Sequence, residues 1–316
     1  MPQPGPANAD LERLRALAPA LHGRQRLLQA VRQFFAARDF LEVETPIRLP
    51  RPALEEFIDA EPAGDWFLRT SPELHMKRLL AAGYPRLVQI GPCFRRGEEG
   101  RQHHPEFTML EWYRANAGCR DILADTVALV RAAAHAVAGA GQWRFRGETI
   151  NADAPWEELT VDEAFQRHAG LTPEAAMREP AGFEQILVER VEPHLGRGRP
   201  TILRDYPLPF AALARPCPGR PDRAERWELY IGGLELANAY GELTDPTEQR
   251  RRFLACADFR RHEGRPIYPL DEPFLAALEA GIPPCGGIAL GFDRLLMTLL
   301  DRPTIADVTA FPPATI

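Results

Sequence analysis

Two glutamates flank a Gly-Gly dipeptide in the segment ERWELYIGGLELANAYGEL, residues 225–243. Two apolar runs joined by Gly232 and Gly233 predict a β-hairpin with a two-residue turn. Strict pairing would place Glu228 and Glu235 diagonally on one face, about 7 to 8 Å apart. Two carboxylates so close repel unless a cation lies between them, and Mg²⁺ carrying phosphates is a natural candidate. An exposed polar strand face is the alternative interpretation.

Cationic residues gather around the segment RQHHPEFTMLEWYR, residues 101–114. We predict an antiparallel hairpin in which the first strand ends at Arg95 and the second begins at Phe107. Arg95, Arg101 and His103 would lie at its mouth, where they could form charge-assisted hydrogen bonds to phosphate oxygens. Phe107 could stack on a base. Taken singly, the histidine fits a surface position and the phenylalanine a core position.

A third candidate segment is PPCGGIALGFDRLLMTLLD, residues 283–301. It predicts a short strand followed, after Gly291, by a helix whose first turn carries Asp293 and Arg294. Free N–H groups at a helix N-terminus and the helix dipole both favour negative charge, so this turn could hold an anionic ligand. A glycine turn in which Arg294 pairs with Asp293 or with solvent explains the same residues.

The remaining elements must position these side chains. Apolar residues at helical spacing predict a helix over residues 24–38, and FLEVETP after it alternates like a strand that stops at Pro46. Residues 120–138 predict a second long helix. Residues 139–225 contain proline- and glycine-rich connectors around two predicted helices, and we interpret them as scaffold.

Composition limits the class of protein. The chain has 316 residues, 45% of them hydrophobic, with no apolar run near the roughly 18 residues that a membrane span needs. Its N-terminus lacks the features of a secretory signal, so we expect a frayed, proline-rich start and a cytoplasmic protein. Five scattered cysteines without CxxC spacing argue against disulfides and a zinc site. The net charge of −6 disfavours nucleic-acid binding that depends mainly on phosphate contacts.

In their order along the chain, the motifs resemble those of class II aminoacyl-tRNA synthetases. The helix that leads to Pro46, FR with HxPEFTMLEWY, and GxALGxDR are similar to motifs 1, 2 and 3. TSPELHMKRL, HHPEFTMLEWY and GLELANAYGELTD resemble the lysyl branch. They resemble still more its truncated paralogue, the family of ligases that attach lysine to elongation factor P. The resemblance runs from about Gly23 to Pro312.

The resemblance implies an α+β fold, with a class II catalytic domain at residues 23–316 whose antiparallel sheet is flanked by helices. Residues 1–22 are an N-terminal extension in this interpretation. Bacterial lysyl-tRNA synthetases carry an anticodon-binding OB-fold domain before this core, and the short extension leaves no room for one. We therefore expect a protein acceptor rather than tRNA. The resemblance also implies a homodimer formed through the helix and strand around residues 24–46.

Motif by motif, the resemblance assigns residues to ATP and Mg²⁺. In chain order they are Arg95, Arg101, His103, Phe107, Glu228, Glu235 and Arg294. Arg95 would contact the α-phosphate and the amino-acid carboxylate, and Arg101 with His103 the distal phosphates. Phe107 and Arg294 would enclose the adenine, and the two glutamates would hold the metal.

A second set of residues would bind the amino acid. In chain order they are Ser71, Glu73, Glu111, Tyr113, Asn238, Glu242 and Ala289. The first two would meet the amine and carboxylate at the backbone side of the substrate. Glu111, Tyr113 and Glu242 would hold its terminal ammonium, since a buried ammonium requires a carboxylate partner. Asn238 belongs to the set only if its strand ends or bulges, because strict alternation points it away from Glu235.

The implied reaction is activation of a lysine-type amino acid by ATP, followed by its transfer to a lysine side chain of elongation factor P. The substrate carboxylate attacks the α-phosphorus, pyrophosphate leaves, and an amine of the acceptor captures the mixed anhydride. This chemistry depends on positioning and charge neutralisation rather than on a catalytic triad. Arg95 and Arg294 are therefore the predicted catalytic residues.

Three positions are informative within the lysyl pattern. Gly97 replaces the glutamate of the usual Arg-x-Glu in motif 2, and Glu98 follows one residue later. Arg101 lies two residues before His103, as in the paralogue. Ala289 stands where lysyl-tRNA synthetases usually have glycine. An added methyl on a pocket wall changes substrate selectivity by about 1 to 3 kcal/mol. We interpret this methyl as favouring (R)-β-lysine over α-lysine. Alternatives are a ligase that acts on tRNA or a small molecule and a non-catalytic, synthetase-like regulator.

Overall fold

The computed structural model of the protein describes residues 6–316. At its centre is a nine-stranded sheet with the order β1-β5-β6-β14-β13-β12-β10-β9, in which β11 also pairs with β12. Neighbouring strands are antiparallel except for β1–β5 and β9–β10 at the two edges. The strands are β1 (Leu41–Glu42), β5 (Arg86–Phe94), β6 (Glu106–Ala115), β9 (Glu157–Thr160), β10 (Thr201–Pro207), β11 (Pro216–Cys217), β12 (Arg220–Ile231), β13 (Leu234–Gly241) and β14 (Cys285–Gly291). The α+β fold with a largely antiparallel sheet is as predicted.

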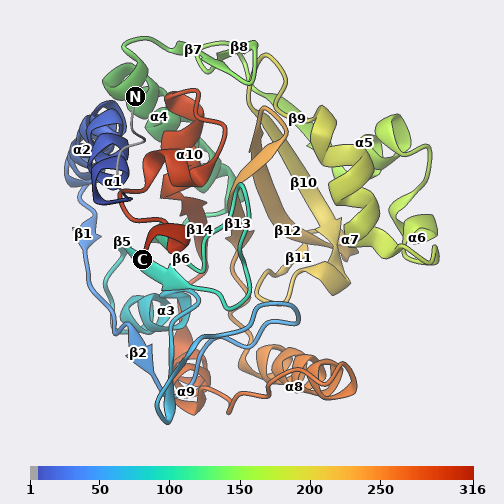
Figure 1. The fold of residues 1–316 in the computed structure, drawn as a ribbon. Helices are drawn as coiled ribbons and strands as arrows, with labels where there is room; N and C mark the ends of the chain where they lie inside the picture. The colour runs from blue at the N-terminus through green and yellow to red at the C-terminus, as the bar shows by residue number, and fades with distance from the viewer. Residues whose placement is uncertain (1–5) are drawn as a thin grey trace.

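Helices surround this sheet (Figure 1). They are α1 (Pro6–Ala16), α2 (Ala18–Ala36), α3 (Glu73–Ala81), α4 (Cys119–Ala138), α5 (Val161–His168), α6 (Pro173–Ala176), α7 (Gly182–Ile186), α8 (Pro246–His262), α9 (Glu272–Gly281) and α10 (Phe292–Leu299). The main hydrophobic core joins α2, α4 and α10 to one face of the sheet, where alternate strand residues such as Trp112 and Leu290 are buried. A second core joins α3, α8 and α9, and a third joins α5 and α7 to β10.

Smaller elements complete the fold. Two small sheets contain β2 (Arg48–Leu49), β3 (Pro62–Ala63) and β4 (Trp66–Leu68), and β7 (Gln142–Phe145) with β8 (Glu148–Asn151). Short 3₁₀ turns cover Glu192–His194, Leu208–Phe210, Ile305–Val308 and Pro313–Thr315, and one π turn covers Leu187–Val191. No helix in residues 6–316 is long and apolar enough to cross a membrane.

The N-terminal region is more ordered than the sequence suggested. Residues 1–5 lie outside the described residues, but α1 begins at Pro6, so the predicted frayed start is wrong from there on. Arg13 of this helix donates to the carbonyl oxygen of Ala310 at 2.9 Å, and Leu17, which joins α1 to α2, is buried in the main core. The helix predicted over residues 24–38 begins at Ala18 and therefore continues across the proposed boundary after residue 22.

The predicted Gly-Gly hairpin is present and contains a bulge. Ile231 pairs with Leu234 and Tyr230 with Glu235, as strict pairing requires. The register then shifts by one residue, so that Leu229 pairs with Ala237 and Glu228 with Asn238. A bulge of this kind reverses the alternation beyond it. Asn238 thereby shares a face with both glutamates, which is the condition under which it was included in the predicted site.

Residues 139–225 contribute more than the scaffold of two helices expected from the sequence. Strands β9, β10 and β11 and the first half of β12 lie in this region and belong to the main sheet, and three short helices pack beside them. Pro209 and Phe210 of this region also reach the cavity described below.

Candidate active site

The face of the sheet opposite the main core carries a polar cavity of about 450 Å³. Strand register sets its floor. One row of paired residues runs across β6, β14, β13 and β12 and consists of Glu111, Ala289, Asn238 and Glu228. The next row on the same face consists of Tyr113, Gly287, Tyr240 and Arg226. Residues far apart in the sequence thus project side by side from four neighbouring strands.

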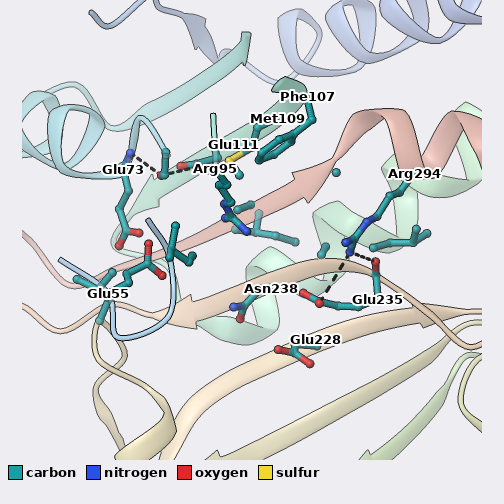
Figure 2. Close-up of a pocket in the computed structure, with 18 of the residues that line it drawn as sticks. Glu55, Glu73, Arg95, Phe107, Met109, Glu111, Glu228, Glu235, Asn238 and Arg294 are labelled. Carbon is teal, nitrogen blue, oxygen red and sulfur yellow. Dashed lines mark hydrogen bonds and ion pairs between the residues drawn. The ribbon is translucent and has the colours of Figure 1, made fainter. Parts of the chain in front are cut away.

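The cavity brings together all the predicted site residues except Arg101. Arg101 is exposed in the loop between β5 and β6, and its carbonyl oxygen accepts a hydrogen bond from Ile305 N–H at 2.9 Å. Its role at the distal phosphates stays a prediction. Figure 2 shows Arg95 and Phe107 across the open space from Asn238 and Glu235.

A carboxylate cluster forms one end of the cavity. The Glu111 carboxylate accepts hydrogen bonds from Ser71 Oγ at 2.6 Å and from the Tyr113 hydroxyl at 3.0 Å. Lys77 Nζ lies 2.5 Å from Glu73 Oε1 and 2.6 Å from Glu242 Oε2. Two of the three buried carboxylates therefore share the single ammonium of Lys77, and Glu111 has no cationic partner.

The pKa values of this cluster reflect that imbalance. Burial raises the pKa of Glu111 to about 8, and the charge of Glu73 adds to the effect. Burial also raises the pKa of Glu242 to about 8, although Lys77 opposes this rise. Lys77 remains protonated because its two carboxylate partners outweigh the opposing effect of burial on its pKa. A second ammonium would stabilise the ionised carboxylates, so this end of the cavity suits an amine ligand.

The guanidinium of Arg95 lies over an aromatic ring. Its Cζ is 5.3 Å from the centroid of the Phe107 ring, and its Nη1 is 3.8 Å from Oε1 of Glu98. Glu98 enters the cavity because Gly97 turns the chain with a φ of +79°, a conformation that favours glycine. The departure from Arg-x-Glu in motif 2 therefore moves a carboxylate by one residue but keeps it in the site.

Arg294 is fixed at the start of α10 by backbone oxygens. It donates to the carbonyl oxygens of Gln102 at 3.1 Å and Glu235 at 2.9 Å, and it contacts Nε2 of His103. Burial lowers the pKa of His103 to about 4, and the positive charge of Arg294 adds to this effect, so the imidazole is neutral at neutral pH. His103 thus accepts a hydrogen bond from Arg294.

Glu228 and Glu235 offer the oxygen donors that Mg²⁺ prefers, although Glu228 has other partners. Its carboxylate accepts hydrogen bonds from Arg226, Tyr206 and Tyr230. Burial and the charge of Glu228 raise the pKa of Glu235 to about 7, so a nearby cation would stabilise its ionised form. No group of three or more potential metal ligands occurs in residues 6–316. Since Mg²⁺ often uses one or two carboxylates together with substrate phosphates, the pair fits a cation that arrives with a phosphate ligand.

The sequence reasoning missed three charged residues that act in or beside the cavity. Arg226 lies two residues before Glu228, so strand alternation could have identified it. Lys77 lies four residues after Glu73 on α3, and helical spacing could have identified it. Glu55 lies in a loop without periodicity, and no local signal marks it.

Gly287 allows Tyr113 and Glu242 to meet in the cavity floor. A Cβ at this position would lie 2.2 Å from the Tyr113 ring and 2.4 Å from Glu242 Oε1. We expect Gly287→Ala to lower the free energy of unfolding by about 1 to 3 kcal/mol, as overpacking typically does. Urea unfolding should show this loss. Gly100→Ala is the control, because its added Cβ would meet no atom within 4 Å; equal stability of the two variants would contradict the close approach.

The fold and the site define a class II synthetase catalytic domain, and comparison with known proteins places it in a family. The model of the family "tRNA synthetases class II (D, K and N)" matches residues 8–315. The chain is 38% identical over 320 residues to an elongation factor P–(R)-β-lysine ligase of Proteus mirabilis, covering 92% of this chain and 93% of that protein. The chain therefore belongs to the class II tRNA synthetase family.

Lysine–tRNA ligases are similarly related. The chain is 39% identical over 318 residues to the enzyme of Moorella thermoacetica and 36% identical over 315 residues to that of Carboxydothermus hydrogenoformans. Each alignment covers 92% of this chain but 64% of the relative. The chain thus spans a little under two thirds of the length of these relatives.

Proposed function

We propose that this protein is an ATP-dependent ligase that adenylates (R)-β-lysine and transfers it to a lysine side chain of elongation factor P. The observation that carries the proposal is the charge arrangement of the cavity. The amine-binding end has three carboxylates for one ammonium, and Arg95 and Arg294 line the same cavity. This arrangement suits a substrate that has both an amino group and a carboxylate to activate. The Proteus mirabilis relative supports the choice of acceptor, because the two proteins match over nearly their full lengths.

The cavity residues divide the reaction between them. Glu111, Tyr113 and Glu242 hold the terminal ammonium. Ser71 and Glu73 lie beside them in the same carboxylate cluster, and we propose that they contact the backbone-side amine and carboxylate from there. Arg95 holds the substrate carboxylate against the α-phosphate. As the carboxylate oxygen attacks phosphorus, the bond to pyrophosphate breaks, and the arginines stabilise the charge on the transferring group. An acceptor amine then attacks the acyl carbon and releases AMP.

Mg²⁺ would be held by Glu235 and Glu228 together with the phosphates of ATP, where it would neutralise charge on the nucleotide. Phe107 and Arg294 enclose the adenine in this proposal. In this proposal the catalytic domain comprises residues 23–316 and residues 1–22 are an extension, and α2 (Ala18–Ala36) joins the two without a break. We also propose a homodimer through residues 24–46, since Leu41 of this region is an exposed apolar residue, as is nearby Ile47.

The test is amino-acid-dependent exchange of pyrophosphate into ATP by the purified protein. We expect exchange with (R)-β-lysine, weaker exchange with α-lysine, and none without amino acid. Labelled amino acid should then appear on purified elongation factor P. Absence of exchange with any lysine isomer, in protein shown to be folded, would refute adenylation and favour a regulatory protein.

Aminoacylation of tRNA is the second candidate function. The lysine–tRNA ligase relatives match this chain at 36% and 39% identity, which is comparable to the elongation factor P ligase. The two functions share the adenylate, so only the acceptor separates them. Transfer of label to tRNA, with none to elongation factor P, would replace the proposed function by this one.

Ala289 provides a test of amino-acid selectivity. Its Cβ projects from the cavity floor between Glu111 and Asn238, its partners in the same row. We expect Ala289→Gly to shift the ratio of kcat/KM for (R)-β-lysine over α-lysine about 10-fold or more towards α-lysine, the size of a methyl-group effect. Pyrophosphate exchange with both isomers measures the ratio, and each isomer serves as the other's control. An unchanged ratio would remove Ala289 from the selectivity determinants.

A further inference from the structure

Glu55 is a carboxylate in the cavity that the motifs do not include. It precedes β3 in the loop that follows β2, and it lines the cavity together with Arg95 and Glu73. Figure 2 shows Glu55 and Glu73 on the same side of the cavity. Two other carboxylates that line the cavity have close partners, since Glu73 pairs with Lys77 and Glu98 with Arg95. Within residues 6–316, no hydrogen bond or ion pair engages the side chain of Glu55.

The loop that carries Glu55 is held firmly in place. Leu54 is buried in the second core immediately before it. After it, Arg260 of α8, which is fully buried, donates to the carbonyl oxygen of Glu55 at 2.6 Å and of Ile58 at 3.0 Å, and to the Asp59 carboxylate at 2.5 Å. The loop therefore holds the backbone of Glu55 at a fixed position beside the cavity, which a specific contact with a ligand requires.

The charges around Glu55 indicate what it could bind. Burial lowers the pKa of Arg95, but neighbouring carboxylates, with Glu55 contributing most, raise it above its ordinary value. Burial raises the pKa of Glu55 to about 7, Arg95 opposes this rise and Glu73 adds to it. Glu55 thus lines the same cavity as a guanidinium that suits a carboxylate and a second carboxylate that already has its own cation. A ligand with an amino group next to a carboxylate would pair its amine with Glu55 and its carboxylate with Arg95.

We propose that Glu55 is a substrate-binding residue that pairs with the amino group nearest the substrate carboxylate, and so selects diamino acids over amino acids with a terminal amine alone. The inference rests on the proposed function, because it takes Arg95 as the site of the substrate carboxylate. A charge-assisted bond of this kind contributes about 10- to 100-fold in affinity. The terminal amine is held separately, at Glu111 and Glu242.

Equilibrium binding of amino acids, measured by calorimetry at mildly alkaline pH where Glu55 is ionised, tests the proposal. The ligands are (R)-β-lysine, α-lysine and 6-aminohexanoate, which lacks the amine near the carboxylate. We expect Glu55→Gln to weaken binding of both lysine isomers about 10- to 100-fold and to leave 6-aminohexanoate unchanged. Glu61→Gln is the control, because Glu61 follows on the same segment and does not line the cavity.

Two outcomes would overturn the role of Glu55. Equal weakening of all three ligands would indicate an indirect effect through Arg95 or the loop, and unchanged binding of every ligand would exclude a contact. Failure of wild-type protein to bind any of the three ligands would also refute it. A different result would show that the proposed function fails while the role of Glu55 holds. Lysine isomers would then bind in a Glu55-dependent manner, but pyrophosphate exchange would be absent. Thermal unfolding of each variant verifies that it is folded.

Discussion

Replacing Arg95 with alanine is expected to lower amino-acid-dependent pyrophosphate exchange by at least about a thousandfold, the scale of an arginine that stabilises a transferring phosphoryl group. The structure gives two reasons. The guanidinium is fixed over the Phe107 ring at 5.3 Å, so it is oriented before a ligand arrives. Within residues 6–316 the side chain of Arg95 donates no hydrogen bond, and its one ion pair, to Glu98, is long at 3.8 Å, so it can pair with an anionic ligand.

The neighbouring Arg96 supplies a matched control for this experiment. It is exposed and does not line the cavity, and the backbone contact of its N–H with the Asp59 carbonyl oxygen at 2.8 Å survives substitution of the side chain. Arg96→Ala should change exchange no more than about twofold, as exposed substitutions usually do. If folded Arg95→Ala protein exchanged pyrophosphate at the wild-type rate, Arg95 would have no part in adenylation, and the site would need another cation for the α-phosphate.

The Gly-Gly hairpin shows how far local patterns predict this site. The turn, the first two residue pairs and the shared face of Glu228 and Glu235 all follow from alternation around two glycines. The bulge at Leu236, opposite Leu229 and Tyr230, does not, because alternation cannot reveal where one strand inserts an extra residue. That bulge decides whether Asn238 faces the cavity or the core.

Loops and long-range contacts set the limit of sequence prediction in this protein. Arg101 has the residue type expected for a phosphate contact, yet the loop between β5 and β6 leaves it exposed outside the cavity lining. Glu55 reaches the cavity because Arg260, about two hundred positions later in the chain, holds its loop. Neither position follows from periodicity. By contrast, strands β6 and β14 pair without a register shift, so Glu111 and Ala289, which the resemblance assigned, lie opposite each other in one row.

The second large effect is expected at Lys77, on the stability of the fold. This residue is almost completely buried, with 1% of its side chain exposed, between Glu73 and Glu242. Lys77→Met leaves two buried carboxylates without a cation, which should lower the free energy of unfolding by about 3 to 5 kcal/mol. Denaturant unfolding measures the loss. Arg120→Met removes an exposed ion pair to Glu158 and should cost no more than about 1 kcal/mol.

Two further measurements separate the loss of charge pairing from a packing defect at Lys77. Adding Glu73→Gln and Glu242→Gln to Lys77→Met should restore much of the stability, because no unpaired buried charge remains. Lowering the pH from about 10 to about 8 should also reduce the deficit. The pKa of Glu242 is raised to about 8 by burial even though Lys77 lowers it, so without Lys77 this carboxyl takes up its proton above pH 8, where it is still ionised in the wild type. If the loss in free energy of unfolding changed neither with pH nor with the glutamine substitutions, Lys77 would stabilise the fold through its aliphatic stem.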